Sequence, residues 1–349
     1  MAPRREPSVE VFPPAAEGSD AAAGGRLKLL RKWRLDGGTT VGLALLVLAV
    51  AVPFNLNGYW VYLGNIALIY IVLTLGFNVI LGWAGQLAIT SAAFFGFGSL
   101  VAGLVSKHYA LPVEVCLLAG TAAGTVLGAA FGALVVRLRR YYLAIATFSL
   151  LYILDYFYRN VPALTGGVSG FAVSPPRALV AGGAVLQQGW AEYFFALGLV
   201  IIVYAFMRWL QTSALGRSWV TLRQDERIAA ALGISVYRSK LLAFTISAGV
   251  MSLAGAWFVF VLGSFLPDNF SLDEMLFDFL ILVVGGLGSV NGAVLGSIFL
   301  VVMREYFRGV PGASEVLFGA LLLLVALFLR RGLYGTLANW LRWLREPFA

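Results

Sequence analysis

The chain has 349 residues, of which 60% are hydrophobic and only 12% are charged. A soluble domain usually carries about twice that share of charged residues, so the composition argues against a soluble globular protein. The net charge is +8, but the basic residues stand between apolar runs, as in membrane proteins, rather than in a nucleic-acid-binding patch. The single cysteine and single histidine exclude an internal disulfide and a histidine metal cluster, and we expect neither a metal site nor a cofactor.

The first 36 residues differ from the rest of the chain. Residues 1–25 are rich in Pro, Ala, Gly and charge, which predicts disorder. No apolar stretch follows the first basic residues, so a secretory signal peptide is not expected. Basic residues then form an anchor before the first apolar run: Arg26, Lys28, Arg31, Lys32 and Arg34. We therefore predict that residues 1–36 are a cytoplasmic tail.

Long apolar runs occupy most of the remaining chain and predict an all-α polytopic membrane protein, because a bilayer-spanning helix needs roughly 20 apolar residues. A transmembrane permease domain is expected over residues 37–332. Its ten predicted spans are 41–56, 60–81, 86–106, 113–135, 141–159, 189–210, 240–262, 275–288, 291–306 and 315–330.

The boundary between the eighth and ninth spans depends on a glycine-rich break at residues 285–289, which read GGLGS. Three glycines in four positions favour a turn over a kinked helix. A turn gives ten spans and a kink gives nine. Ten spans place most of the 25 lysines and arginines inside, with both termini, so the positive-inside rule favours ten.

Residues 211–239 form the largest hydrophilic loop predicted on the inner side. A short helix is expected around the alanines at 229–231, because Asp225 and Glu226 precede them and Gly233 follows. Acidic residues favour a helix start and glycine commonly follows a helix end. Such a short helix can dock into a groove of a soluble partner, although an ordinary connector with a helical turn has a similar sequence.

Residues 222–234, which read LRQDERIAAALGI, resemble the coupling segment of branched-chain amino acid ABC importer permeases, in particular the M-type. Further matching segments follow the family's order: GFNVILGWAGQ at 76–86, AAFFGFG at 92–98, Arg137-Leu138-Arg139, YLAIAT at 142–147, TGG at 165–167, GGLG at 285–288 and Arg304-Glu305. The resemblance covers about residues 60–332. It implies a type II ABC-importer fold.

The resemblance also implies partners: a second (H-type) permease, two ATPase subunits and an extracytoplasmic solute-binding protein. The chain has no GxxxxGK[ST] phosphate loop, so ATP hydrolysis is expected on other chains and this subunit is not expected to be an enzyme. The implied ATPase-coupling residues are Arg223, Asp225, Glu226, Ala229, Ala230 and Gly233. The implied location is the bacterial inner membrane.

Several polar residues fall within or beside the predicted spans: Asn78, Gln86, Thr90, Ser91 and Asp278. Such groups usually face the helix bundle or a water-filled path, so they are candidates for a solute path. For any one of these side chains, hydrogen bonding between helices is the more common use. Asp155 and Arg159 are spaced to form an i, i+4 pair, whereas Asp278 has no partner in sequence.

Two alternatives to an amino acid ABC permease remain: a urea or amide permease of the same family, and an ion-gradient-driven secondary transporter. Many relatives carry histidine where this chain has Ser91, and related permeases move urea, amides and other amino acids. An ion-gradient-driven transporter would use carboxylates in broken helices, which Asp278 before the glycine break partly fits. A membrane enzyme is remote, because no nucleophile–base set occurs.

Residues 333–349 are expected to be a cytoplasmic tail, with 333–344 along the membrane surface as an amphipathic helix.

Overall fold

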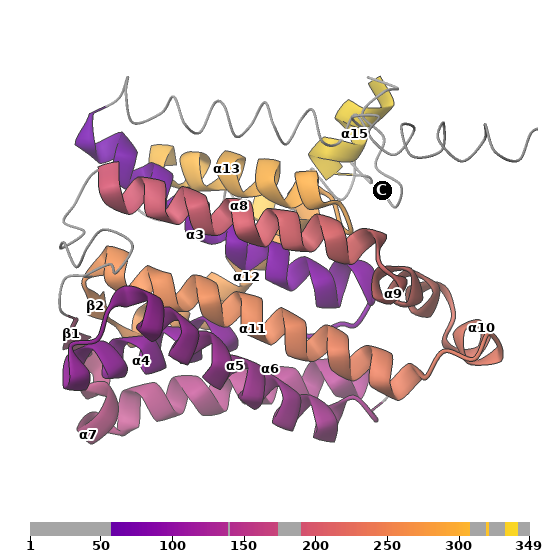
Figure 1. Cartoon of the computed structure of the whole chain (residues 1–349), viewed down its shortest axis with the longest axis horizontal. Helices are drawn as coiled ribbons and strands as arrows, with labels where there is room; N and C mark the ends of the chain where they lie inside the picture. The colour runs from indigo at the N-terminus through magenta and orange to yellow at the C-terminus, as the bar shows by residue number, and fades with distance from the viewer. Residues whose placement is uncertain (1–56, 139, 174–189, 308–318, 321–331, 341–349) are drawn as a thin grey trace, which may run out of the picture. The chain divides into compact units, whose positions relative to one another are not determined.

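The computed structural model of the chain describes residues 57–138, 140–173, 190–307, 319–320 and 332–340, all within one compact unit, Gly37–Ala349 (Figure 1). The predicted tail at 1–36 and the span at 41–56 lie outside the described residues. The span predicted at 315–330 also lies outside them, apart from residues 319 and 320.

Long helices dominate the described part of the chain. Six are long and apolar enough to cross a membrane: Gly58–Trp83, Val113–Val135, Tyr141–Asn160, Trp190–Thr212, Val236–Leu262 and Val290–Phe307. They correspond to α3 (Gly58–Phe77) with the π-helical segment η2 (Asn78–Trp83), α5 (Val113–Val135), α6 (Arg140–Asn160), α8 (Trp190–Thr212), α11 (Val236–Leu262) and α13 (Val290–Phe307). The all-α polytopic class is thereby confirmed.

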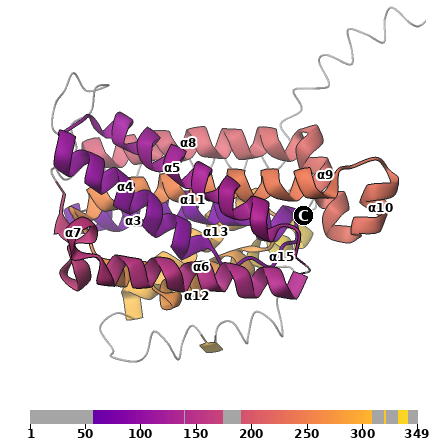
Figure 2. The same ribbon diagram turned by 90° about the horizontal axis from the view of Figure 1, so that it is seen from below.

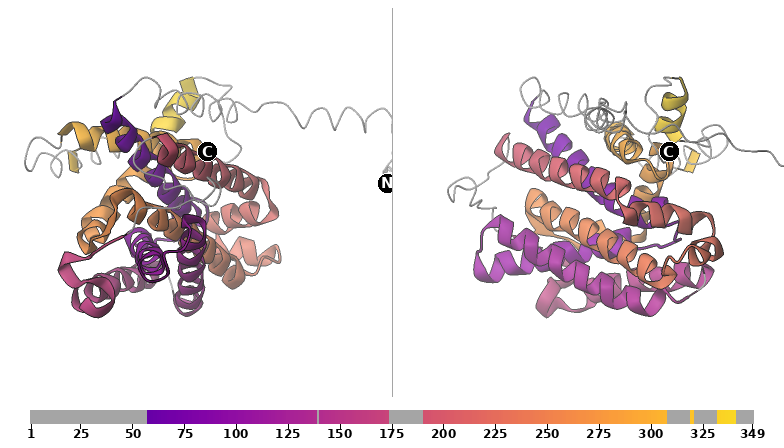
Figure 3. Two further views of the ribbon diagram at one scale, coloured as in Figure 1. Left: turned by 60° about the vertical axis from the view of Figure 1, so that its left-hand side comes forward. Right: turned by 45° about the vertical axis from the view of Figure 1, so that its right-hand side comes forward.

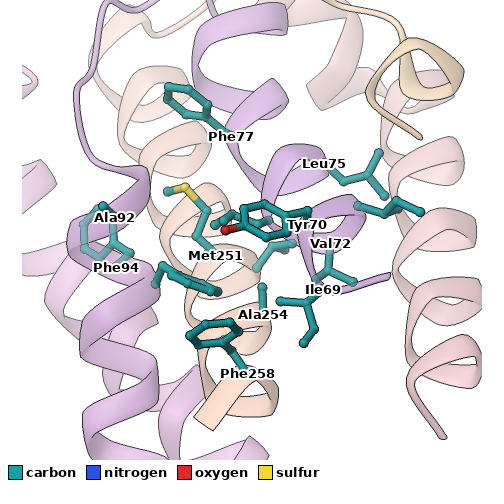
Figure 4. Close-up of a cluster of buried hydrophobic side chains, with 14 of the residues drawn as sticks. Ile69, Tyr70, Val72, Leu75, Phe77, Ala92, Phe94, Met251, Ala254 and Phe258 are labelled. Atoms are coloured by element: carbon teal, nitrogen blue, oxygen red, sulfur yellow. The ribbon is translucent and has the colours of Figure 1, made fainter. Parts of the chain in front are cut away.

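Helix α3 lies in the interior. It packs against α11, α13 and α8, and nearly all of the apolar part of the segment Gly58–Trp83, which comprises α3 and η2, is buried. A helix that is apolar all round is expected to be buried. Figure 4 shows side chains of α3, including Tyr70, gathered with Met251, Phe258 and Phe94 from the neighbouring helices. The core therefore forms around α3.

Three helices approach one another closely: α4 (Ser91–Tyr109), α5 and α11 (Figure 3). The α5 glycines at 120, 124, 128 and 132 are all buried, and an added Cβ on each would meet side chains or backbone of α4 or α11. The same holds for Gly98, whose added Cβ would overlap the backbone of Ser252. The every-fourth-residue glycine row is a packing surface, because it lets helix backbones come together.

One predicted span begins later than expected. Helix α4 starts at Ser91, and residues 85–90 have no regular secondary structure, so the helix predicted from residue 86 was wrong at its start. The amide of Ile89 donates to the Thr147 hydroxyl of α6 at 2.9 Å, which replaces a helical hydrogen bond. Irregular backbone at membrane depth is tolerated where it is buried in protein or lines a cavity.

Short elements close one end of the bundle: α7 (Pro162–Thr165), η3 (Gly167–Ser169), β1 (Phe171–Ala172), β2 (Ser264–Phe265) and η4 (Pro267–Phe270). Strands β1 and β2 are antiparallel, with Phe171 opposite Phe265 and their rings stacked at 5.4 Å. At the other end α9 (Ala214–Gln224) and α10 (Glu226–Ala231) extend beyond α11 (Figure 2). Helix α9, which continues almost directly from α8, was not predicted from the sequence.

The glycine-rich break is a turn, as predicted. Helix α12 (Leu272–Gly285) ends there, α13 begins at Val290, and the amide of Ser289 donates to Gly286 oxygen at 3.3 Å. The 14 residues of α12 span about 21 Å, which is shorter than a hydrocarbon core.

A C-terminal helix packs against this break. Helix α15 (Gly332–Trp340) contacts α12 and α13, and Tyr334 on its first turn is fully buried. Tyr334 also accepts a hydrogen bond from Asn291 at 3.3 Å, so the first turn of the helix predicted for the membrane surface packs against the bundle.

Candidate functional site: an exposed helical loop and a buried polar cluster

Both helices of the hydrophilic loop are capped by side chains. The Ser213 hydroxyl accepts from the amide of Gly216 at 3.3 Å at the start of α9. Asp225 ends α9 and begins α10, where its carboxylate accepts from the amide of Arg227 at 2.6 Å. Caps of this kind stabilise a helix by about 1 kcal/mol. The predicted short helix near 229–231 is confirmed, with Asp225 as its N-cap.

Helix α10 presents apolar side chains outward. Ile228 and Leu232, four residues apart, are 56% and 68% exposed, whereas Ala229 between them is fully buried. Ala230 is exposed beside them. Gly233 then turns the chain with φ +79°, a conformation that other residues rarely adopt. The outer face of α10 is thus a small, exposed and apolar surface on a defined helix.

An ion pair ties α10 to the start of α11. Lys240 Nζ lies 2.6 Å from a carboxylate oxygen of Glu226, and the Lys240 side chain is only 11% exposed. Because Lys240 belongs to a long helix that packs against α3, α4 and α5, this contact joins the exposed loop to the core of the bundle.

A second connection runs through α9, and we call it the α9 junction: Trp83, Trp219, Arg223 and the turn Gly286–Ser289. Arg223 donates to the carbonyl of Gly82 at 2.5 Å. The fully buried Trp219 stacks on Trp83, with ring centroids 6.3 Å apart. Trp83 in turn donates to the carbonyl of Gly288 at 2.9 Å. The junction therefore links α9, η2 and the break between α12 and α13.

Asn78 of η2 contacts the same turn as the α9 junction. Its amide oxygen accepts from the amide of Gly288 at 2.9 Å, and its amide nitrogen donates to the carbonyl of Ser289 at 3.2 Å. Both ends of the side chain are thus engaged in holding the turn. Of the five polar residues predicted for a solute path, Asn78 is the one that the structure gives hydrogen-bond partners.

The other four carry buried polar atoms without hydrogen-bond partners in the described part of the chain. Asp278, Thr90 and Ser91 are fully buried and Gln86 is 4% exposed. The unpartnered atoms are both carboxylate oxygens of Asp278, both amide atoms of Gln86 and the two hydroxyls. Ser91 and Asp278 lie side by side without reaching hydrogen-bond geometry. We call Gln86, Thr90, Ser91 and Asp278 the polar cluster.

The ion pair between Glu274 and Arg304, one helical turn from Asp278, was not predicted from the sequence. Arg304 of α13 binds both carboxylate oxygens of Glu274 at 3.1–3.2 Å, and the Tyr70 hydroxyl donates to the same carboxylate. Arg304 also lies over the ring of Phe277, 4.6 Å from its centroid. The signal was present: antiparallel helices joined by a short turn bring the start of α12 beside the end of α13.

The predicted pairing of Asp155 with Arg159 is confirmed at 3.0 Å, and Arg159 also contacts the exposed Asp268 at 2.7 Å. Among the described residues no group of three or more His, Cys, Asp or Glu could hold a metal ion. The described part of the chain thus contains buried polar atoms without partners and, separately, an exposed helix that an ion pair joins to the bundle.

A bundle of apolar spanning helices with a buried polar cluster and a tethered exposed loop defines a polytopic membrane permease. Residues 60–326 match the family described as branched-chain amino acid transport system / permease component. The chain is 34% identical to the high-affinity branched-chain amino acid transport system permease protein LivM of Escherichia coli, over 83% of this chain and 73% of that protein. LivM of Salmonella typhimurium gives the same identity and coverage. A probable LivM of Methanocaldococcus jannaschii is 25% identical over 49% of this chain and 53% of its own.

No solved structure matches the chain. From the sequence comparisons, the chain belongs to the branched-chain amino acid transport permease family. It is a permease subunit of an ABC importer in the inner membrane, and ATP hydrolysis lies on separate subunits.

Proposed function

We propose that the chain carries branched-chain or closely related amino acids inward, as the M-type member of a permease pair. The LivM relatives are named for high-affinity branched-chain amino acid transport, and their similarity extends over most of both chains. The proposed assembly contains an H-type permease, two ATPase subunits and an extracytoplasmic binding protein. Both termini are then cytoplasmic, as the distribution of basic residues favours.

The observation that carries the coupling role is the exposed outer face of α10. Ile228, Leu232 and Ala230 point away from the bundle on a capped helix, which suits a groove of a soluble partner. We assign this face to one ATPase subunit. Arg223, Asp225, Glu226, Ala229 and Gly233 hold the helix in place rather than form its apolar contact surface.

Movement of α10 has two routes into the bundle. The Glu226–Lys240 ion pair leads to α11, and the α9 junction leads to η2 and to the turn between α12 and α13. The residues of the polar cluster follow η2 in sequence, begin α4 or belong to α12. We propose that closure of the ATPase pair moves these helices and opens the polar cluster to solute. Packed helices that have two discrete arrangements can transmit a change from one site to another in this way.

The test is purification of the tagged chain with whatever accompanies it, followed by reconstitution with the binding protein. We expect two ATPase chains and a second permease to co-purify, and leucine uptake to require ATP. Recovery without an ATPase, together with leucine uptake that persists without ATP, would overturn the proposal. Uptake of urea or an amide in place of leucine would retain the ATP-driven mechanism and overturn the amino acid assignment.

A further inference from the structure

The most unusual residue in the buried interior is Asp278. It is fully buried, and neither carboxylate oxygen has a hydrogen-bond partner among the described residues. A buried carboxylate without a partner is costly, and acids inside a membrane are usually retained for function. Among the described residues, α12 therefore holds a buried carboxylate that is available to a ligand.

Among the described residues, the cation that acts on Asp278 is Arg304, and it is already engaged. Arg304 binds both oxygens of Glu274, one helical turn from Asp278, and the Tyr70 hydroxyl completes that contact. The Glu274–Arg304 pair is neutral as a unit, so among the described residues it offers no free cation to Asp278. A positive group from outside the chain would supply what is missing.

Helix α4 begins beside this carboxylate. Ser91 is its first residue, Thr90 is its N-cap position, and no side chain caps it. The first intrahelical hydrogen bond is from the amide of Phe94 to the carbonyl of Thr90. The earliest amides of a helix have no intrahelical acceptor, and together with the helix dipole they attract a carboxylate. A helix of 19 residues has a fully developed dipole.

We propose that Asp278, with the hydroxyls of Ser91 and Thr90 and the first amides of α4, binds the zwitterionic head group of an α-amino acid during transport. The ammonium group pairs with Asp278, and the carboxylate lies at the N-terminus of α4. The two subsites are adjacent because Ser91 lies beside Asp278, which matches the short separation of the two charges in an α-amino acid.

The cluster suits an ammonium ion better than a metal ion. Among the described residues no group of three or more His, Cys, Asp or Glu could hold a metal ion, whereas one carboxylate with two hydroxyls provides oxygens for an ammonium group with three donors. Urea and simple amides have no net positive group and gain little from Asp278. The inference rests on the proposed amino acid transport and specifies which atoms recognise the solute.

The test uses the complete transporter in proteoliposomes, with Asp278→Asn and, as a control, Asp155→Asn. Both substitutions remove a carboxylate and keep the shape, but Asp155 already pairs with Arg159. We expect Asp278→Asn to lower leucine uptake at least about tenfold, because the ammonium group of leucine loses the carboxylate with which it pairs. Hydrolysis of ATP stimulated by the loaded binding protein should stay within about twofold of the wild-type rate, and Asp155→Asn should leave both rates within about twofold.

Unchanged leucine uptake by Asp278→Asn would overturn the inference. A parallel fall of uptake and ATP hydrolysis would overturn it too, because that result indicates a structural role. A wild-type transporter without ATP-dependent leucine uptake would instead refute the proposed function.

A second measurement uses only the wild-type complex, so that it does not depend on the folding of a variant. Labelled leucine is bound to the complex in the absence of the binding protein. We expect unlabelled leucine to displace the labelled leucine. Neither 4-methylpentanoic acid, which lacks the amino group, nor 3-methylbutylamine, which lacks the carboxylate, should displace it. Equal competition by either analogue, or no specific binding of leucine, would contradict the zwitterion site.

Discussion

The guanidinium of Arg223 donates a 2.5 Å hydrogen bond to the backbone carbonyl of Gly82, which joins the loop helix α9 to the last turn of η2. The residues are 141 positions apart in sequence. The space around them is tight, since a Cβ on Gly85 would lie 2.6 Å from Cγ of Arg223. The exposed loop is therefore attached to the interior at a defined point.

The first prediction concerns this attachment. Arg223→Ala removes a hydrogen bond from a charged donor, of the kind that contributes about 1.5–3 kcal/mol, and leaves the Trp219–Trp83 stack as the remaining described side-chain contact between α9 and η2. We expect leucine transported per ATP hydrolysed to fall about fivefold, with the ATPases still bound. Uptake and ATP hydrolysis in proteoliposomes give the ratio. Arg238→Ala, at an exposed arginine of α11, serves as the control, and an unchanged ratio for Arg223→Ala would show that the hydrogen bond does not transmit motion.

The second prediction concerns the end of α10. Gly233 has φ +79° and open space around a would-be Cβ, so a substitution there changes backbone preference without a steric clash. Gly233→Val is expected to cost roughly 1–2 kcal/mol and to lower ATPase stimulation several-fold by misplacing α10. Gly233→Asn should retain more activity, because asparagine tolerates this conformation better.

The matched control for Gly233 is Gly198→Val on α8. That glycine also has open space around it but lies within a helix. Equal stimulation by the valine and asparagine variants of Gly233 would mean that the left-handed turn does not position the helix.

The third prediction concerns helix packing. A Cβ at Gly98 would overlap the backbone of Ser252, which cannot move aside as a flexible side chain can. Gly98→Ala should therefore destabilise the protein by at least the 1–3 kcal/mol typical of overpacking. Ala122→Val on the exposed side of α5 should change stability by less than about 0.5 kcal/mol. Thermal unfolding of the purified chain in detergent measures both, and similar midpoints would contradict this packing.

The fourth prediction compares two ion pairs. Glu274 is 9% exposed in its pair with half-buried Arg304, whereas Asp268 is 73% exposed in its pair with Arg159. Loss of a buried partner costs about 3–5 kcal/mol, and the exposure of Arg304 reduces this to roughly 1–3 kcal/mol. We expect Glu274→Gln to lower stability by that amount and Asp268→Asn by less than about 1 kcal/mol. A larger loss for Asp268→Asn would reverse the ranking drawn from burial.

The sequence anticipated the elements that depend on local chemistry. The apolar runs gave spanning helices, the glycines at 285–288 gave a turn, and Asp225 and Gly233 bounded a short helix. Helix α9 was missed because its composition is polar enough to resemble a connector. The start of α4 was misplaced because a hydroxyl from α6 satisfies the amide of Ile89, and no local pattern indicates that contact.

By itself the sequence determined the membrane class and the family, and it predicted candidate residues for a path and a coupling loop. These follow from hydrophobic length, charge distribution and motif order, which are properties of neighbouring residues. Only the tertiary structure decided how those residues are used. In the structure, Asn78 accepts a hydrogen bond from the turn at Gly288, and Glu274 pairs with Arg304. Asp278 lies beside Ser91 without a hydrogen-bond partner among the described residues. The reason is physical: whether a buried polar atom is satisfied depends on which distant helix packs against it.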